Sequence, residues 1–266
     1  MENHLRQFKA IVEYDGTDFA GFQWQSNARS VQSVLEAAIE KRTGQNVRVA
    51  CAGRTDAGVH ALGQVISFRV NTEIPIEKMA LALNSALSKD ITVRKANEVE
   101  ASFHARFSAS SRKYYYLMLS RKMPSAFLRR YVGFTPYALD LDAMQTATES
   151  ILGERDFAAF ANELQPGKPT SRDLMRFDIR KHRGLFVVRV EANAFLRGMV
   201  RTMVGTLLEV GHGKRDPESL PDLLATRNRK LAGASAHAQG LCLYRVRYGV
   251  RKEYGLTRTE EFEETE

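Results

Sequence analysis

The chain repeats one order of secondary-structure elements twice, and this repetition limits the folds that it can adopt. Apolar residues alternate with polar ones in some stretches and recur at helical spacing in others. In the first part these patterns predict a strand at 7–14, a helix at 31–42, strands at 47–52 and 64–70, a helix at 76–87 and a strand at 91–99. The order strand, helix, strand, strand, helix, strand is that of a ferredoxin-like domain.

A similar order follows residue 105. The expected elements are a strand at 113–119, a helix at 140–151, a hairpin of 172–181 and 185–192, helices at 195–210 and 217–226, and a strand at 241–248. We therefore predict an α+β protein with two ferredoxin-like domains, at 1–105 and 106–250. The two domains are expected to form a continuous, mostly antiparallel sheet with a basic cleft between them. Residues 251–266 are expected to be a flexible acidic tail.

The charge of the chain indicates a polyanionic partner. Lys and Arg number 39 against 31 Asp and Glu, a formal net charge of +8. Five of the acids lie in the last eight residues, and removing them from +8 leaves +13 on the rest of the chain. An excess of this size is typical of nucleic-acid binding, although a solvated basic surface is the alternative.

Cysteine usage and hydropathy indicate the compartment. Cys51 and Cys242 form neither a CxxC pair nor a disulfide framework, which favours a reducing environment. No apolar run approaches the ~18 residues of a membrane span, and the first residues do not resemble a signal peptide. We expect a cytoplasmic protein without membrane contact.

The segment 53–60, GRTDAGVH, is the sharpest chemical signal in the chain. Between its two glycines it holds one guanidinium, Arg54, and one carboxylate, Asp56, in a loop that joins two expected strands. Loops held by a rigid scaffold often carry catalytic residues. The alternative is a purely structural loop with a surface ion pair.

A second signal is a pair of arginines in an apolar segment. Residues 195–210 are apolar nearly all round, which predicts a buried helix, and Arg197 and Arg201 would share one face of it. Because an unpaired buried charge is costly, such a guanidinium needs an anion or a path to solvent. We predict that Arg201 holds the carboxylate of Asp56 across the cleft, which favours the ionised form that a nucleophile requires. Pairing of one arginine with a local carboxylate is the alternative.

Three consecutive tyrosines give the third signal. On a strand, Tyr114 and Tyr116 share one face and Tyr115 takes the other. Core packing accounts for Tyr115 and Tyr116. Tyr114 follows Arg112 and Lys113, so its ring could stack on a base and its hydroxyl could take part in proton transfer.

Residues 52–61, AGRTDAGVHA, resemble the active-site motif of the tRNA pseudouridine synthase A family. Further blocks in the family's order are YDGT at 14–17, FHARFSA at 103–109, RKY at 112–114, ANAF at 192–195 and MVR at 199–201. The resemblance spans roughly residues 8–248, which is nearly the whole chain.

The resemblance implies a homodimeric enzyme that converts uridine to pseudouridine at positions 38, 39 and 40 of the tRNA anticodon stem-loop. By the same motifs Asp56 is the catalytic aspartate, paired with Arg201. Arg54 would take the place of the flipped base, and Tyr114 would contact that base. Since the rearrangement adds no atoms and changes no redox state, no cofactor and no metal are expected.

Two other classes of protein stay open on the sequence. A non-catalytic RNA-binding module would explain basic runs such as 180–183, but it would not need Asp56, an anion placed where RNA binds. A metallohydrolase is disfavoured because the histidines show no paired spacing of metal ligands.

Overall fold

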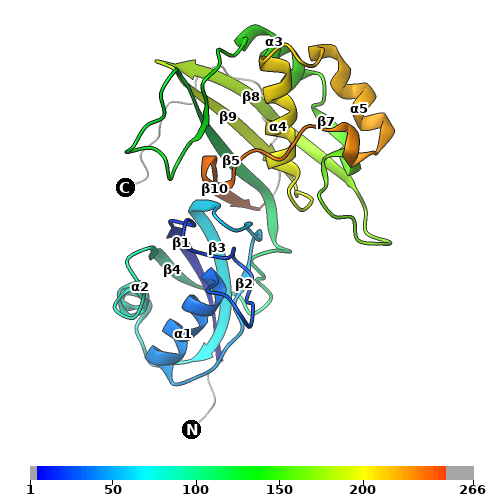
Figure 1. Ribbon diagram of the computed structural model, residues 1–266. Coiled ribbons are helices and arrows are strands. Elements are labelled where there is room, and N and C mark those ends of the chain that lie inside the picture. Colours follow the sequence, from blue (N-terminus) through cyan, green and yellow to red (C-terminus); the bar gives the residue numbers. More distant parts are fainter. Residues whose placement is uncertain (1–4, 250–266) are drawn as a thin grey trace.

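The computed structural model describes residues 5–249 (Figure 1). Its strands are β1 (Leu5–Tyr14), β2 (Ala50–Cys51), β3 (His60–Asn71), β4 (Ile91–Val99), β5 (Ala109–Ser120), β6 (Gly133–Thr135), β7 (Gly153–Asp156), β8 (Ser171–His182), β9 (Leu185–Ala192) and β10 (Leu241–Tyr248). Its α-helices are α1 (Val31–Thr43), α2 (Ile76–Asn84), α3 (Leu141–Glu149), α4 (Met199–Gly211) and α5 (Leu220–Thr226). The expected acidic tail lies outside the described residues.

The strands form one mostly antiparallel sheet. Along it the order is β4-β1-β3-β10-β5-β9-β8-β7, with β2 beside β3 and β6 beside β5. In Figure 1 α1 and α2 lie with β1 to β4 in the lower part, and α3, α4 and α5 lie with the later strands in the upper part. The predicted α+β class and the large, mostly antiparallel sheet are confirmed. Within residues 5–249 no helix has the length and apolar character needed to cross a membrane.

Local sequence explains where the first helix begins and ends. The Ser30 hydroxyl accepts a hydrogen bond from Ser33 N, and the Ser33 hydroxyl accepts one from Ser30 N, so both free amides are satisfied. Gly44 ends the helix in the left-handed region at φ +71°, where glycine is favoured. The buried face of α1 carries Val31, Leu35, Ala38 and Ile39. The helix predicted at 31–42 is confirmed.

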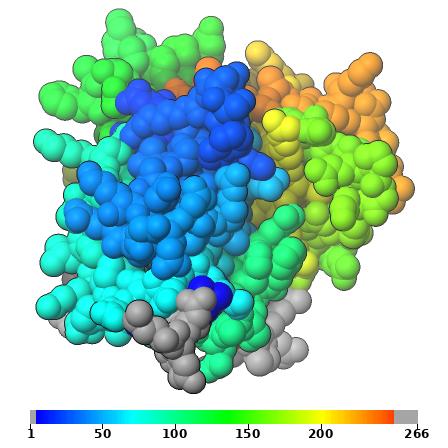
Figure 2. All heavy atoms as spheres, turned by 90° about the horizontal axis from the view of Figure 1, so that it is seen from below, coloured from blue at the N-terminus to red at the C-terminus, as the bar shows by residue number. Residues whose placement is uncertain are grey.

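Strand β10 joins the early and the late strands. It runs parallel to β3, with Leu243 opposite Ala61, and antiparallel to β5, with Leu243 opposite Tyr114. Ala61 follows the 53–60 segment by one residue. The register therefore places Tyr114 one strand away from the end of that segment, although the two are far apart in sequence. In Figure 2 the blue and cyan surface of the early residues meets the yellow and green surface of the later ones.

Four expectations for local structure are wrong in part. The strand expected at 47–52 shortens to Ala50–Cys51, and the next strand starts earlier than expected, at His60. The helix expected from 195 begins at Met199. Gly198, with φ +71°, is in the left-handed region and cannot continue a right-handed helix toward residue 195. Tyr115 is not in the core: it is half-buried and stacks on Tyr244 with 4.5 Å between ring centroids.

Candidate active site

The loop between β2 and β3 lies against an earlier segment, residues 15–22. Phe22 N donates to Thr55 O at 3.0 Å, and the Tyr14 hydroxyl lies 2.8 Å from Thr55 Oγ1 in a buried hydrogen bond. Gly21 has φ +99°, and a Cβ added there would lie 2.9 Å from Thr55 O. Such a close backbone approach requires glycine. These contacts fix the middle of the loop and leave Arg54 exposed and Asp56 half-buried.

Asp56 and Arg201 meet as the sequence predicted. Arg201 Nη1 donates to Asp56 Oδ2 at 3.1 Å, and the two side chains are 21% and 33% exposed. Arg201 Nε donates to Ala236 O at 2.8 Å, which fixes the plane of the guanidinium. The carboxylate is therefore oriented by a cation from helix α4, and it is exposed enough for solvent and substrate to reach it.

Arg197 behaves differently from Arg201. It precedes α4, its side chain is 70% exposed, and it pairs with Glu163. The expectation that Arg197 and Arg201 share a helical face is wrong, because the helix starts only at Met199. The alternative of a local carboxylate partner applies to Arg197.

Arg54 projects from the same loop, two residues before Asp56. No hydrogen bond or ion pair between described residues engages its guanidinium. An exposed cation that has no partner among residues 5–249, beside a half-buried carboxylate, is available to a phosphate or to a nucleotide.

Tyr114 is a buried tyrosine beside the start of the loop. Its ring packs edge-on against Phe195 at 5.2 Å between centroids, and its hydroxyl would lie 3.5 Å from a Cβ added at Gly53. Burial raises the pKa of Tyr114 well above its usual value, with a smaller opposing effect of the Arg112 charge. Tyr114 is therefore protonated at neutral pH, so its hydroxyl can donate a hydrogen bond but is a poor base.

Sequence reasoning missed the structural role of Arg112. This buried guanidinium donates only to backbone carbonyls: to Ala52 O from Nε and Nη2 at 3.1 and 2.9 Å, to Asn193 O at 2.7 Å, to Ala109 O at 3.2 Å and to Arg106 O at 2.5 Å. Ala52 immediately precedes the loop, so Arg112 ties the loop's entrance to β5. The signal was present, since Arg112 has the same strand parity as buried Tyr114 and Tyr116.

Within residues 5–249 no group of three or more His, Cys, Asp or Glu side chains could hold a metal ion. The chemistry that this site offers is that of one carboxylate, one orienting guanidinium, one free guanidinium and one phenol.

Comparison with known proteins agrees with the motifs. The model of a family described as tRNA pseudouridine synthase matches residues 10–108 and 147–249. The tRNA pseudouridine synthase A of Thermoanaerobacter sp. (strain X514) is 43% identical over 244 residues, which are 92% of this chain and 100% of the relative. The chain belongs to the tRNA pseudouridine synthase family. It is an isomerase that acts on uridine in tRNA.

Other relatives of the synthase are equally similar. The tRNA pseudouridine synthase A of Nitrosomonas eutropha is 43% identical over 91% of this chain and 87% of the relative. An H/ACA ribonucleoprotein structure with a substrate RNA containing 2'-deoxyuridine superimposes with a TM-score of 0.33 and 15% identity, over 76% of this chain and 44% of that chain. This structural likeness is too weak to support an argument.

Proposed function

We propose that the synthase converts uridines 38, 39 and 40 of the tRNA anticodon stem-loop to pseudouridine, with Asp56 as the essential catalytic group. The observation that carries the proposal is the 3.1 Å contact between Asp56 and Arg201, which orients a solvent-accessible carboxylate in a basic protein. Such a carboxylate can attack the ribose anomeric carbon, attack the uracil ring, or remove a proton in a glycal route. Each route breaks the bond between the ribose and the uracil nitrogen and rejoins the ribose to carbon 5 of the ring, and none needs a cofactor.

Arg54 is proposed to replace the target base in the helix. A uridine inside a stem must leave the stack before a carboxylate can reach it, at a cost of a few kcal/mol. Arg54 is exposed on the loop that carries Asp56. When the target base leaves the stack to reach the carboxylate, the vacated position in the stack would lie beside the Arg54 guanidinium. Tyr114, next to Gly53, would contact the flipped base.

The proposed RNA surface lies in a basic cleft between two ferredoxin-like domains, at 1–105 and 106–250. The strand orders β4-β1-β3-β2 and β10-β5-β9-β8 are equivalent, which supports the division. Without the five acidic residues at its end, the chain has a net charge of +13. Lysines and arginines of this remaining part would contact phosphates.

The synthase is proposed to work as a cytoplasmic homodimer. Large apolar side chains are exposed between residues 123 and 137, and they include Phe127 at 93%, Met123 at 73% and Tyr137 at 69%. Exposed apolar groups concentrated in one segment favour an interface. Sedimentation of the full chain would show a dimer if this is correct and a monomer if it is not.

The site of modification can be tested with anticodon stem-loops that each carry one 5-tritiated uridine, at position 38, 39 or 40. The tritium is released when carbon 5 becomes the glycosidic carbon. A T-arm hairpin of the same tRNA with one labelled uridine is the matched control. We expect release from all three anticodon substrates and at least about tenfold slower release from the control. Equal rates on the control hairpin would overturn the positional assignment.

A further inference from the structure

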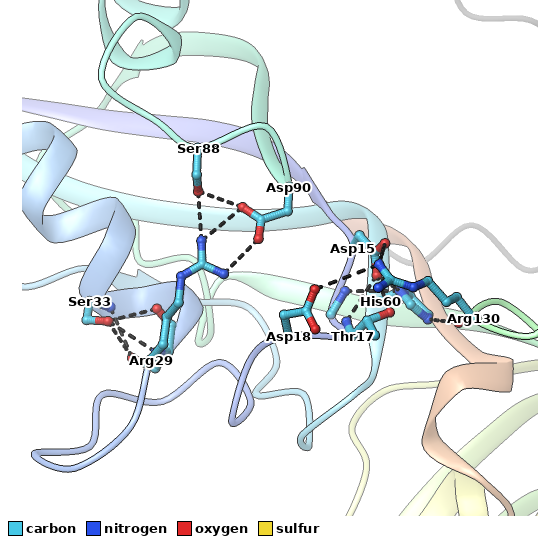
Figure 3. Close-up of polar contacts among 11 residues, drawn as sticks. Asp15, Thr17, Asp18, Arg29, Ser33, His60, Ser88, Asp90 and Arg130 are labelled. Carbon is cyan, nitrogen blue, oxygen red and sulfur yellow. Dashed lines mark hydrogen bonds and ion pairs between the residues drawn. The ribbon is translucent and has the colours of Figure 1, made fainter.

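His60 is a buried histidine at the end of the loop at 53–60, which carries Asp56 and is called the catalytic loop below. The chemistry proposed above does not use His60. It is the first residue of β3, and its side chain is 8% exposed. Its Nδ1 lies 3.0 Å from Gly16 N, and its Nε2 lies 2.8 Å from Arg130 O (Figure 3). The two ring nitrogens therefore contact backbone groups from two distant segments.

These two partners define the protonation state of the ring. A backbone N–H can only donate, so Nδ1 accepts from Gly16 and carries no proton. A backbone carbonyl can only accept, so Nε2 carries the proton and donates to Arg130 O. A neutral imidazole in the Nε2–H tautomer satisfies both groups.

Asp15 lies close to the same ring but has other donors. Its Oδ1 is 3.2 Å from His60 Nδ1, yet Oδ1 accepts from Thr17 N at 3.0 Å and Thr17 Oγ1 at 2.6 Å. Its Oδ2 accepts from the Tyr131 hydroxyl at 2.8 Å. Asp15 is therefore hydrogen-bonded without a charged His60.

The hydrogen bond from Gly16 to His60 holds the end of the loop against the 15–22 segment. A Cβ added at Gly16 would lie 2.0 Å from Val59 O, so the two backbones touch where the loop ends. The same 15–22 segment supports Thr55 through Phe22 N. The 15–22 segment therefore contacts the middle of the loop at Thr55 and, through His60, also the end of the loop.

The hydrogen bond to Arg130 crosses to the other part of the molecule. Arg130 lies in the connection between β5 and β6, and its guanidinium also approaches Asp18 at 3.7 Å. The Tyr131 ring packs against the His60 ring at 5.2 Å between centroids. At the other end of the loop, Arg112 of β5 binds Ala52 O. The loop that carries Asp56 is therefore tied to the later strands at both ends.

We propose that His60 is a positioning residue, which holds the catalytic loop where Asp56 contacts Arg201. It does so as a neutral imidazole that accepts from Gly16 N and donates to the Arg130 carbonyl. The inference rests on the proposed role of Asp56. Asp56 belongs to the loop and Arg201 to α4, so a shift of the loop against the later strands changes their contact directly. A misplacement of about 1 Å can cost up to about 100-fold in rate.

Three substitutions separate the two hydrogen bonds. The side-chain amide of Asn falls near the position of Nδ1, so His60→Asn keeps the acceptor for Gly16 and loses the bridge. The amide of Gln falls near Nε2, so His60→Gln keeps the donor for Arg130 O. His60→Ala loses both. The matched control is His212→Gln, since His212 is half-buried and, within residues 5–249, its ring makes one hydrogen bond, from Nε2 to Thr135 Oγ1 at 3.2 Å.

The rate is measured in single turnover at saturating enzyme, and tRNA affinity, thermal stability and sedimentation are measured alongside. We expect His60→Ala to lose at least about tenfold in rate with affinity within about threefold. His60→Gln should regain more of the rate than His60→Asn, and His212→Gln should equal wild type. Sedimentation of the His60 variants should match that of wild type.

Two results would overturn the proposal. One is a rate within about twofold of wild type in all three His60 variants. The other is a loss that follows thermal stability alone, with no recovery in His60→Gln. If a variant does not fold, the nitrogen-15 spectrum of wild-type His60 decides instead: we expect an unprotonated Nδ1, and a protonated Nδ1 contradicts the bridge. Failure of Asp56 as the catalytic group would appear separately, as an active Asp56→Asn enzyme.

Discussion

Arg201 Nη1 lies 3.1 Å from Asp56 Oδ2, although the two residues are 145 positions apart in the chain. Arg201 Nε also donates to Ala236 O at 2.8 Å, and this second hydrogen bond stabilises the guanidinium in the orientation that faces the carboxylate. Among the described residues no donor is bonded to Asp56 Oδ1. This arrangement leaves one oxygen of an oriented carboxylate for the substrate, and it gives the first two predictions.

Replacing the carboxylate should stop the reaction and spare binding. Asp56→Asn keeps the size of the side chain and an acceptor for Arg201 but removes the negative charge. We expect pseudouridine formation to fall by at least about 1,000-fold, because a neutral amide cannot replace the carboxylate as nucleophile or base. Affinity for tRNA should stay within a few-fold, since removing an anion does not weaken binding to a polyanion. Tritium release and filter binding measure the two effects, and appreciable turnover by the pure variant would contradict the assignment.

The ion pair should make a modest contribution to stability. A fully buried pair broken on one side costs about 3–5 kcal/mol. The Asp56 and Arg201 side chains are 33% and 21% exposed, so we expect a coupling free energy nearer about 1 kcal/mol. Urea unfolding of Asp56→Leu, Arg201→Leu and the double variant gives this quantity. Arg201→Leu should also lose most activity, and the double variant should not regain it. Additive effects on stability would show that the two residues do not interact.

Arg54 should matter most when the target is paired. If its side chain fills the gap left by the uridine, Arg54→Ala should slow single turnover more on a paired anticodon-stem uridine than on the same stem with a mismatch, where part of the opening cost is absent. A residue that only contacts phosphate would instead weaken binding to both stems alike and reduce the salt dependence. Equal rate losses on the two stems would remove Arg54 from base flipping.

Tyr114 should act as a hydrogen-bond donor across the working pH range. Burial raises its pKa above the ordinary value of 10.0, so the protonated form persists as pH rises from neutral. Tyr114→Phe keeps the ring against Phe195 and should lower the rate by about tenfold through loss of one hydrogen bond. Both enzymes should show the same alkaline pH profile up to about pH 9.5, because the phenol does not ionise in this range. A loss of wild-type activity on the alkaline side that Tyr114→Phe abolishes would contradict this.

Asp15 should stabilise the fold only above acidic pH. Burial alone would raise its pKa, but hydrogen bonds from Thr17 and Tyr131 outweigh burial and lower the pKa below the ordinary 3.8. A carboxyl with a lowered folded-state pKa stabilises the protein above the unfolded-state pKa, and this stability is lost as pH falls through the folded-state value. Asp15→Asn should therefore cost about 1 kcal/mol at pH 6, and the difference from wild type should shrink below about pH 3.8.

Chemical denaturation at several pH values measures the difference. Tyr131→Phe is the control, because it removes one of the donors to Asp15 and should show a smaller difference with the same sign. A difference between wild type and Asp15→Asn that grows on acidification would mean that Asp15 is not stabilised as a carboxylate.

The sequence by itself determined the elements whose causes are local. Ser30 and Gly44 bound α1 because capping involves residues a few positions apart, and the hairpin of β8 and β9 follows from alternation around 182–184. The motif at 53–60 indicated Arg54 and Asp56 as catalytic candidates. Because a buried guanidinium requires an anionic partner, the sequence also predicted the contact of Arg201 with Asp56.

Only the tertiary structure decided how these elements are joined. Nothing in the pattern of 241–248 shows that β10 lies between β3 and β5, since the same alternation fits any neighbour in a sheet. The five hydrogen bonds of Arg112 and the two of His60 go to backbone groups, which are identical at every residue, so the sequence does not indicate which residues are the partners. Periodicity records which face of an element is buried, whereas backbone partners depend on the packing of the whole chain.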